Sequence, residues 1–270
     1  MLSCSSLTVT YGQRKALDGF DLSLQPGEVR ALIGPNGSGK STALQAIAGL
    51  TKPTKGSITI NGKSIAKLSR RQIAKELAFL PQQPVAPDEI SVIELVRQGR
   101  FAHVGLLGRY TSRDEDAIHW ALENTGLSDF ATRPLRELSG GERQRAWIAA
   151  ALAQEAEILL LDEPTTYLDI GFQVEVIDLV YRLSREKNVA VVMSIHDLNQ
   201  AMAICDRISL LKHGQLMFDG EPNDLAQSDL IEEVFRVKGH FVPITPYAPP
   251  HFDVELARRG TVITTELRSC

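Results

Sequence analysis

Alternating apolar and polar residues open the chain and predict a small group of strands. The stretch 6–11 alternates and is rich in β-forming residues, and the stretch 17–24 has the same character up to the turn at 26–27. A further strand is predicted at 57–60, where the pair Asn61-Gly62 signals a hairpin.

Short, mostly apolar runs form a second kind of pattern, and one of them, 158–161, is continuously aliphatic. They occupy residues 29–33, 78–80, 158–161 and 189–195. Strands that are apolar on both faces are typical of a parallel sheet covered by helices. Further strands are predicted at 208–211 and 215–218, and helices at 43–48, 67–76, 174–185, 198–205 and 222–235. This alternation predicts a mainly parallel, doubly wound sheet.

Residues 85–154 differ, because helical periodicity replaces the strand-like runs. Helices are predicted at 92–96, 114–125 and 142–154, and residues 99–108 are expected to form an exposed, glycine-punctuated connection. We interpret this region as a helical subdomain inserted into the α/β core. Its histidines, His103 and His119, are expected on the surface. Residues after about 240 are rich in proline and β-forming residues, which favours a small extension or hairpin without an interpretable motif.

Composition narrows the class of protein. A chain of 270 residues, 43% hydrophobic and 23% charged, is an ordinary globular chain with room for one large α/β domain and a subdomain. The net charge of −4 argues against a nucleic-acid-binding surface. No apolar run reaches the roughly 18 residues of a membrane span. Residues 1–4 resemble a lipid-attachment site but lack a preceding signal region, and Cys4, Cys205 and Cys270 form no metal or disulfide pattern. A cytoplasmic protein is expected.

A glycine-rich loop between the strand 29–33 and the helix 43–48 carries the clearest chemistry. It matches the P-loop pattern at every fixed position and consists of Gly34, Pro35, Asn36, Gly37, Ser38, Gly39, Lys40, Ser41 and Thr42. The glycines let backbone N–H groups surround an anion, and the following helix contributes its positive N-terminal end. Lys40 can reach the β- and γ-phosphates, and the Ser41 hydroxyl can bind Mg²⁺. The sequence therefore predicts a nucleoside triphosphate site.

Two pairs of polar residues follow buried strands. Asp162-Glu163 ends the run 158–161, at the edge where open α/β sheets bind ligands. Asp162 can hold a metal and Glu163 can act as general base, although capping of the next segment is also compatible with the pair. His196-Asp197 ends the run 189–195 in the same way. His196 could contribute to capping the next helix, or contact the γ-phosphate or the attacking water.

Three further positions have one structural and one functional interpretation each. Tyr11 could be a half-buried strand residue, or its ring could stack on a nucleobase. Gln82 could be an ordinary loop residue, or it could orient a water molecule or touch Mg²⁺. Ser139 can cap a helix together with Glu142, but the adjacent Gly140 and Gly141 also leave a bare helix N-terminus suited to an anion.

Taken in this order, the motifs resemble the nucleotide-binding subunit of ATP-binding cassette (ABC) transporters, from about residue 5 to 235. The stretch Leu-Ser-Gly-Gly-Glu at 138–142 corresponds to the signature of that family. The resemblance implies a P-loop NTPase core with a mainly parallel sheet, an N-terminal antiparallel β subdomain and an inserted helical subdomain. Within one ABC ATPase domain, the expected parts are the strands and P-loop at 1–84, the signature subdomain at 85–154, the rest of the core at 155–239 and an extension at 240–270.

The resemblance also implies a role for each motif residue. The residues implied at the nucleotide are Tyr11, the loop 34–42, Ser139, Gly140, Gly141 and Asp169. Those implied in catalysis are Glu163, His196 and Gln82. Those implied at magnesium are Ser41, Gln82 and Asp162. Tyr11 would stack on adenine. Ser139 and Gly141 would clamp the γ-phosphate of ATP bound to another copy of the chain, with Asp169 at that interface. Glu163 would be the general base, and His196 would hold the γ-phosphate.

At the level of function, the resemblance implies an ATP- and Mg²⁺-dependent homodimer on the cytoplasmic face of the membrane. It would drive a separate permease, served indirectly by an extracytoplasmic solute-binding protein, and would bind no nucleic acid. Residues 165–170 and 196–201 resemble importers of iron–siderophore chelates, haem or cobalamin, and a ferric siderophore is the expected cargo. Alternatives are an ABC protein acting on ribosomes or DNA, which a single acidic cassette disfavours, and an adaptor without turnover, which the presence of Glu163 and His196 disfavours.

Overall fold

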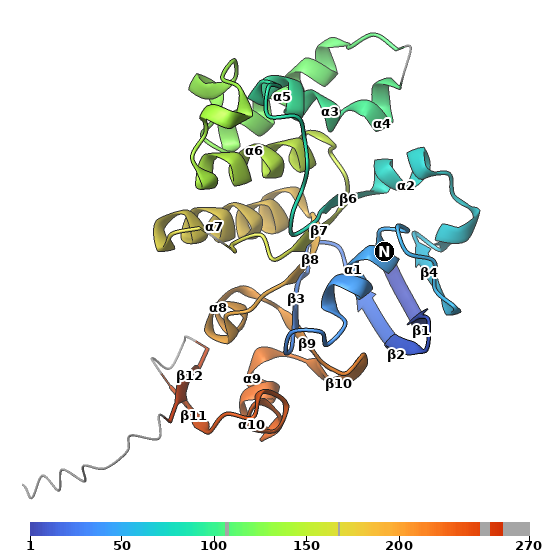
Figure 1. The fold of residues 1–270 in the computed structure, drawn as a ribbon, viewed down its shortest axis with the longest axis vertical. Coiled ribbons are helices and arrows are strands. Elements are labelled where there is room, and N and C mark those ends of the chain that lie inside the picture. The colour runs from blue at the N-terminus through green and yellow to red at the C-terminus, as the bar shows by residue number, and fades with distance from the viewer. Residues whose placement is uncertain (106–107, 167, 244–248, 256–270) are drawn as a thin grey trace, which may run out of the picture.

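The computed structural model describes residues 1–105, 108–166, 168–243 and 249–255 (Figure 1). Cys270, Tyr167 and most of the proposed extension 240–270 lie outside the described residues. Within those ranges, no helix is long and apolar enough to cross a membrane.

The centre of the molecule is a six-stranded sheet with the order β10-β9-β3-β8-β7-β6. Its strands are β3 (Val29–Ile33), β6 (Leu77–Leu80), β7 (Ile158–Asp162), β8 (Ala190–Ser194), β9 (Arg207–Lys212) and β10 (Gln215–Gly220). All neighbours are parallel except the hairpin β9–β10, which confirms the predicted mainly parallel sheet. Every residue of β3, β7 and β8 is buried, including Arg30 of β3, whose guanidinium pairs with Glu28 at 2.9 Å. Asp162 and Leu32 both pair with Ser194, so the three central strands end at the same level.

One face of this sheet packs against an antiparallel N-terminal sheet with the order β2-β1-β4-β5. Its strands are β1 (Leu2–Tyr11), β2 (Arg14–Leu24), β4 (Lys55–Ile60) and β5 (Lys63–Ser64). Helix α1 (Lys40–Ile47) contributes Ala43, Leu44 and Ile47 to the core between the two sheets. The strand pleat separates the two faces, because Leu32 belongs to this core whereas Ala31 and Ile33 belong to the core on the other side.

The other face is covered by helices, including α7 (Ile170–Lys187), α8 (Leu198–Ile204), α9 (Pro222–Ala226) and α10 (Leu230–Phe235). The single helix predicted at 222–235 is wrong, because it is divided into α9 and α10. Ser228 explains the break: its hydroxyl and its backbone N–H both donate to the carbonyl of Leu225, so the backbone turns there instead of continuing the helix. The C-terminal strands β11 (Gly239–Val242) and β12 (His251–Val254) form the hairpin that the sequence favoured.

Beyond the sheet edge lies a layer of short helices, seen in green at the top of Figure 1. It contains α3 (Val92–Gln98), α4 (Phe101–Val104), α5 (Ser112–Asn124) and α6 (Gly140–Ala153). The helix α2 (Arg70–Glu76) connects the N-terminal sheet to β6. It starts three residues later than predicted, because Ser69 and Gln72 form a capping box that fixes its first turn.

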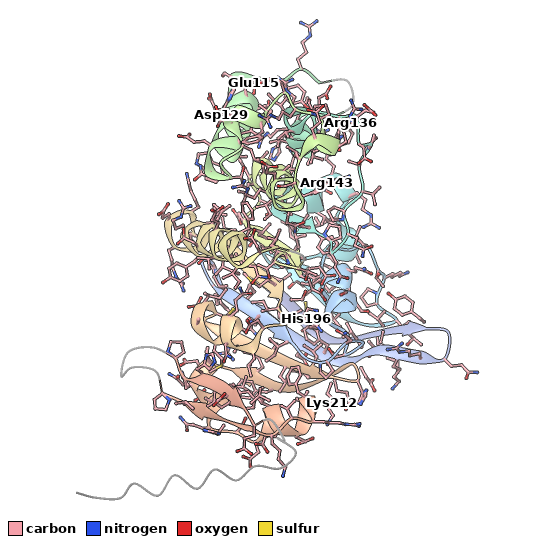
Figure 2. The ribbon with its side chains drawn as sticks, turned by 60° about the vertical axis from the view of Figure 1, so that its left-hand side comes forward. Glu115, Asp129, Arg136, Arg143, His196 and Lys212 are labelled. Carbon is pink, nitrogen blue, oxygen red and sulfur yellow. The ribbon has the colours of Figure 1, made fainter. Side chains whose placement is uncertain are left out.

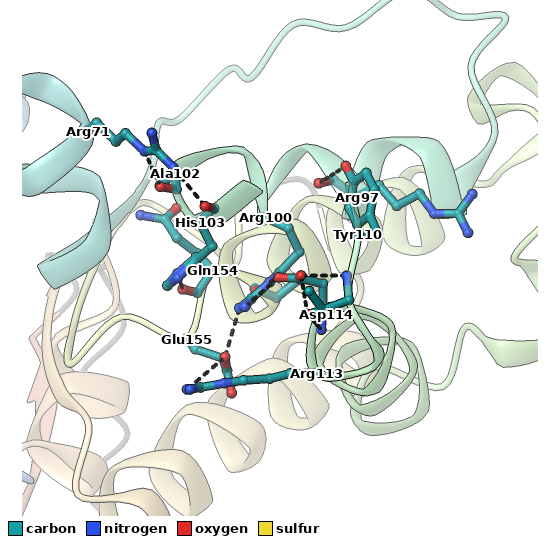
Figure 3. A network of polar contacts seen from close by, with 12 residues as sticks. Arg71, Arg97, Arg100, Ala102, His103, Tyr110, Arg113, Asp114, Gln154 and Glu155 are labelled. Atoms are coloured by element: carbon teal, nitrogen blue, oxygen red, sulfur yellow. Dashed lines mark hydrogen bonds and ion pairs between the residues drawn. The ribbon is translucent and has the colours of Figure 1, made fainter. Parts of the chain in front are cut away.

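The predicted exposed connection at 99–108 is partly wrong, because it contains α4 and a buried arginine. Arg100 is only 1% exposed. Its guanidinium pairs with Asp114 at 2.9 Å and donates to the Ala153 carbonyl and the Glu155 carboxylate, each at 2.8 Å (Figure 3). The local sequence gives no sign of this burial, because the partners of Arg100 lie 14 to 55 residues away.

Further hydrogen bonds connect the helical layer to the core sheet. Arg71 of α2 donates to the carbonyls of Ala102 and His103, both at 2.7 Å. His103 is half-buried, and its Nε2 lies 2.8 Å from the Gln154 carbonyl, whereas His119 is exposed as predicted. Gln154 in turn donates to the Leu77 carbonyl at 2.8 Å, at the start of β6. The C-terminal end of α6 is therefore anchored to the strand that leads to Gln82.

Candidate active site

The loop after β3 is shaped so closely by its neighbours that only glycine fits at two positions. A Cβ at Gly34 would lie 2.2 Å from the Leu211 carbonyl oxygen, and one at Gly39 would lie 2.7 Å from the Ala16 carbonyl oxygen. Both residues also have positive φ, 144° and 113°. Helix α1 starts directly after Gly39 with no side-chain cap, so its N-terminal N–H groups remain available to an anion.

Lys40 is folded back into this loop. Its Nζ donates to the Gly34 carbonyl at 2.8 Å and to the Pro35 carbonyl at 3.3 Å, and the residue is 5% exposed. Burial lowers the pKa of Lys40, and the nearby charges of Glu163 and Asp162 partly oppose that shift. Because this ammonium group is poorly solvated, an anion that enters the loop would stabilise its charged form.

The buried hydroxyl of Ser38 adds a second sign that the loop is built around an anion. Ser38 is 2% exposed, and its Oγ has no hydrogen-bond partner among the described residues. A buried polar group without a partner is costly, and a ligand is one of its ordinary explanations. Together with the glycine positions and Lys40, it shows that the residues present fit a phosphate group.

Asp162 lies at the end of β7, next to the loop. Its Oδ1 accepts a hydrogen bond from Ser41 at 3.1 Å and another from Ser194 at 2.6 Å, and the residue is 3% exposed. A hydroxyl and a carboxylate side by side are oxygen ligands of the kind that Mg²⁺ takes alongside phosphate oxygens. Ser41 and Asp162 therefore fit a magnesium ion.

Glu163 is the point where the predicted catalytic residues meet. Its Oε1 lies 2.5 Å from His196 Nε2, and its Oε2 accepts hydrogen bonds from Gln82 and, at 3.2 Å, from Thr166. The backbone of Glu163 is in the left-handed region with φ 52°, which is uncommon for a residue other than glycine and marks a strained position. Its N–H donates to Ser194 Oγ at 2.8 Å, which holds the strained residue in place.

Tyr11 is the last residue of β1 and is exposed. The residue is 52% exposed, and its hydroxyl is 3.5 Å from the hydroxyl of Thr51. The stacking interpretation requires a free aromatic face, and this geometry leaves the ring accessible.

The double-glycine stretch starts α6 in the helical layer. Ser139 caps it: its Oγ accepts from the Glu142 N–H at 3.3 Å, and Glu142 accepts from the Ser139 N–H at 2.7 Å. Hydrogen bonds from the backbone N–H and the hydroxyl of Ser139 lower the pKa of the Glu142 carboxyl. A Cβ on Gly140 would meet nothing within 4 Å, whereas one on Gly141 would lie 2.9 Å from the ring of Phe172. The capping interpretation is confirmed, and Gly140 faces open space.

Asp169 caps α7 and meets the same phenylalanine. Its Oδ1 accepts from the Phe172 N–H at 3.0 Å, and the ring of Phe172 lies next to Gly141. Phe172 therefore links Asp169 to Gly141. Among the hydrogen bonds between described residues, none joins 139–141 to the loop 34–42. Figure 2 shows Arg143 of α6 well above His196 along the long axis of the molecule.

Three residues of the site were not predicted. Ser194 is hidden inside an aliphatic run, although its place at the end of β8 equals that of Asp162 in β7 and could have marked it. Thr166 and Phe172 carry no local signal, because their roles depend on contacts formed only in the fold.

A phosphate loop with a buried lysine, a buried aspartate beside its serine, and a glutamate joined to a histidine together define a P-loop nucleoside triphosphatase. The sequence model of the family described as "ABC transporter" matches residues 17–166. The chain belongs to the ABC transporter family, and it is an ATPase that is coupled to transport.

Among curated proteins, the iron(3+)-hydroxamate import ATP-binding protein FhuC of Bacillus subtilis (strain 168) is 43% identical over 241 residues, which are 89% of this chain and 90% of that protein. The ferric enterobactin transport ATP-binding protein FepC of Escherichia coli (strain K12) is 38% identical over 232 residues, 86% of each chain.

Among solved structures, one of an inward-facing transporter assigned to the metal-chelate ABC type matches with a TM-score of 0.82 at 29% identity, covering 95% of this chain and 98% of that one. A dimeric ATP-binding cassette bound to ADP and Pi matches with a TM-score of 0.72 at 30% identity, covering 82% and 98%. These neighbours confirm the predicted fold class.

Proposed function

We propose that this chain is the ATP-hydrolysing subunit of an importer for a metal chelate, with a ferric siderophore as cargo. The observation that carries the catalytic part is the junction at Glu163, where one carboxylate contacts His196, Gln82 and Thr166. The cargo is proposed from the relatives, since FhuC and FepC are named for ferric hydroxamate and ferric enterobactin. Haem or cobalamin import is the runner-up.

Binding of ATP would use groups that are already in place. Lys40 would leave the carbonyls of its own loop and donate to the β- and γ-phosphates, and the N–H groups of residues 34–42 would surround them. Ser41, Asp162 and Gln82 would hold Mg²⁺, which supplies positive charge next to the phosphates during their transfer. Ser194 keeps Asp162 oriented through its 2.6 Å hydrogen bond.

Hydrolysis requires a base close to the terminal phosphate, and Glu163 is proposed for this role. Its carboxylate would accept the proton of an attacking water, while Gln82 orients that water. His196, whose side chain is 46% exposed, would turn one ring nitrogen to the γ-phosphate and remain close to Glu163. The strained backbone of Glu163 fixes the direction in which the carboxylate points.

A second copy of the chain would complete the site. Gly140 faces open space and α6 presents its N-terminus there, so we propose that Ser139, Gly140 and Gly141 bind the γ-phosphate held by the partner, with Asp169 at the interface. The exposed ring of Tyr11 would stack on adenine. The dimeric cassette among the structural neighbours supports this arrangement.

The remaining assignments follow from the importer function. The chain would sit on the cytoplasmic face of the membrane against permease subunits, with the loop of Gln82 towards them, and would meet an extracytoplasmic solute-binding protein only indirectly. We propose the functional division 1–84, 85–154, 155–239 and 240–270 for the core with its P-loop, the signature subdomain, the rest of the core and the extension.

The catalytic proposal is tested with Glu163→Gln. This change keeps the shape of the side chain but removes the base, so we expect ATP to bind as in the parent protein and turnover to fall by 10²-fold or more. ATP-bound dimers should then accumulate in size-exclusion chromatography. Glu186→Gln, at an exposed position of α7, is the matched control and should hydrolyse ATP at the parent rate. Parental turnover by Glu163→Gln would refute the base assignment.

The cargo is tested in cells that lack the gene for this chain. Uptake of radioactive iron supplied as a ferric hydroxamate should be lost and should return with the parent gene but not with Glu163→Gln. Loss of haem or cobalamin uptake instead, with hydroxamate uptake intact, would replace the siderophore assignment by the runner-up.

A further inference from the structure

The side chain of Asn199, on the first turn of α8, binds the backbone of the C-terminal hairpin at two points. Its Oδ1 accepts from the Phe252 N–H at 2.7 Å, and its Nδ2 donates to the Phe252 carbonyl at 3.2 Å. The same Nδ2 lies 3.1 Å from His251 Nε2. A side-chain amide has one acceptor oxygen and one NH₂ group, so both ends of Asn199 are engaged by β12. It pairs with the strand as a neighbouring peptide group would.

The hairpin that Asn199 contacts is itself anchored to the core. Phe252 is 6% exposed and belongs to the main hydrophobic cluster, where its ring meets that of Phe241 edge-on at 5.0 Å. The Gly239 N–H donates to Glu232 of α10 at 3.0 Å, and the Glu255 N–H donates to the Lys238 carbonyl at 2.8 Å. The hairpin is therefore held against the core, and it can hold α8 in place.

Helix α8 needs such a support. It has seven residues, and only Ala201 and Met202 among them are buried. A helix this short is not stable by its own hydrogen bonds and depends on tertiary contacts. Figure 1 shows α8 between β3 of the central sheet on one side and β12 on the other, and α8 contacts both strands. Asn199 supplies hydrogen bonds on the hairpin side.

The placement of α8 sets the position of His196. The Ile195 N–H is fixed to the Leu32 carbonyl at 3.1 Å, and Asp197 caps α8 by accepting from the Gln200 N–H at 3.1 Å. His196 is the single residue between these two anchored points. A shift of α8 would therefore move the imidazole relative to Glu163, from which it is separated by 2.5 Å.

From this geometry we infer that Asn199 is a positioning residue for ATP hydrolysis: by binding Phe252 of the C-terminal hairpin, it holds α8, and thereby His196, in register with Glu163. This gives β11 and β12 a role in the reaction although none of the proposed catalytic residues lies on them. The inference rests on the proposed role of His196 and concerns the same site.

The test is steady-state ATP hydrolysis by the full-length chain. In Asn199→Ala both contacts to Phe252 are lost, and we expect kcat to fall about tenfold. The KM for ATP should stay within about twofold, because Tyr11 and the loop 34–42, which are proposed to hold most of the nucleotide, lie on other elements and His196 itself is retained. Asn124→Ala is the matched control: its side chain also donates to a main-chain carbonyl, that of Trp120 at 2.9 Å, but in α5. Its kcat should equal that of the parent.

A merely structural role is separated from positioning by a double-mutant cycle. If Asn199 acts through His196, adding Asn199→Ala to His196→Ala causes no further loss of kcat. All rates are measured below the start of thermal unfolding of each variant, and Asn199→Ser replaces Asn199→Ala if the latter does not fold.

The outcomes are distinguishable. Parental kcat in Asn199→Ala, or the same tenfold loss in the presence and absence of His196, overturns the inference while leaving the proposed function intact. Parental kcat in His196→Ala overturns the proposed role of His196 itself.

Discussion

Replacing the buried Arg100 by leucine is expected to destabilise the protein strongly. Leucine retains much of the apolar stem but leaves Asp114, 5% exposed, without its cationic partner, and leaves the Ala153 carbonyl without a donor. Removing one member of a buried ion pair costs about 3–5 kcal/mol. The lost contact to Glu155 adds little, because that side chain is 37% exposed and screened by water.

The same substitution should change the dependence of stability on pH. Hydrogen bonds from Thr111, followed by that from Arg100, lower the pKa of the Asp114 carboxyl to about 2 from an ordinary value of 3.8. Because the folded-state pKa is depressed, this stabilisation is present above pH 3.8 and is lost as the pH falls towards 2. Without Arg100 the pKa of the Asp114 carboxyl lies closer to its ordinary value, although the hydrogen bonds from Thr111 still keep it depressed. The variant therefore loses less stability than the parent as the pH falls from 3.8 towards 2.

Urea denaturation at pH 7 and at pH 3 measures both effects. Arg113→Leu is the matched control, since Arg113 also approaches Glu155, at 3.6 Å, but its side chain is 79% exposed. It should change the free energy of unfolding by less than about 0.5 kcal/mol. If Arg100→Leu were within about 1 kcal/mol of the parent at pH 7, the buried pair would not be the anchor of the helical layer.

The remaining predictions concern the phosphate loop and the signature helix. Lys40→Ala should abolish binding of a fluorescent ATP analogue while the thermal midpoint moves by less than about 4 °C, since it also removes a poorly solvated charge; undiminished affinity would contradict the role of Lys40. Gly140→Ala should keep the parental midpoint but lose most ATPase activity, because its Cβ meets only open space in the free chain. Gly141→Ala should lower the midpoint as well, because its Cβ approaches the Phe172 ring at 2.9 Å; equal behaviour of the two glycine variants would refute the distinction.

Much of the core could be predicted because its signals are local. The mostly apolar runs predicted β3, β7 and β8, and parallel strands place their C-terminal ends on one edge of the sheet. That rule alone predicts that Asp162-Glu163 and His196 should lie near the loop that follows β3. The structure brings them together, with Glu163 Oε1 next to His196 Nε2.

The rest depends on contacts between residues far apart in the sequence. The burial of Arg100 requires Asp114 and Glu155 from two other segments, and no periodicity of residues 99–108 indicates it. Ser194 becomes part of the site only because β7 and β8 pair in one register, and a shift by one residue would turn its side chain to the other face. The link between Asn199 and Phe252 spans 53 residues and joins two segments whose individual patterns suggested no contact.

Three residues of the site are placed where an anion could bind. Ser38 Oγ is buried without a hydrogen-bond partner among the described residues, Lys40 donates to carbonyls of its own loop, and Gly140 opens onto free space. Burial of the Ser38 hydroxyl and of the Lys40 charge costs free energy that only a partner returns, whereas Gly140 leaves the N-terminus of α6 open. A phosphate group would satisfy Ser38 and Lys40 together. Gly140 lies on another layer, and under the proposed function it meets the phosphate held by a second copy of the chain. Under the proposed function, the site is complete only when nucleotide and a second cassette are both in place, so hydrolysis would be linked to assembly.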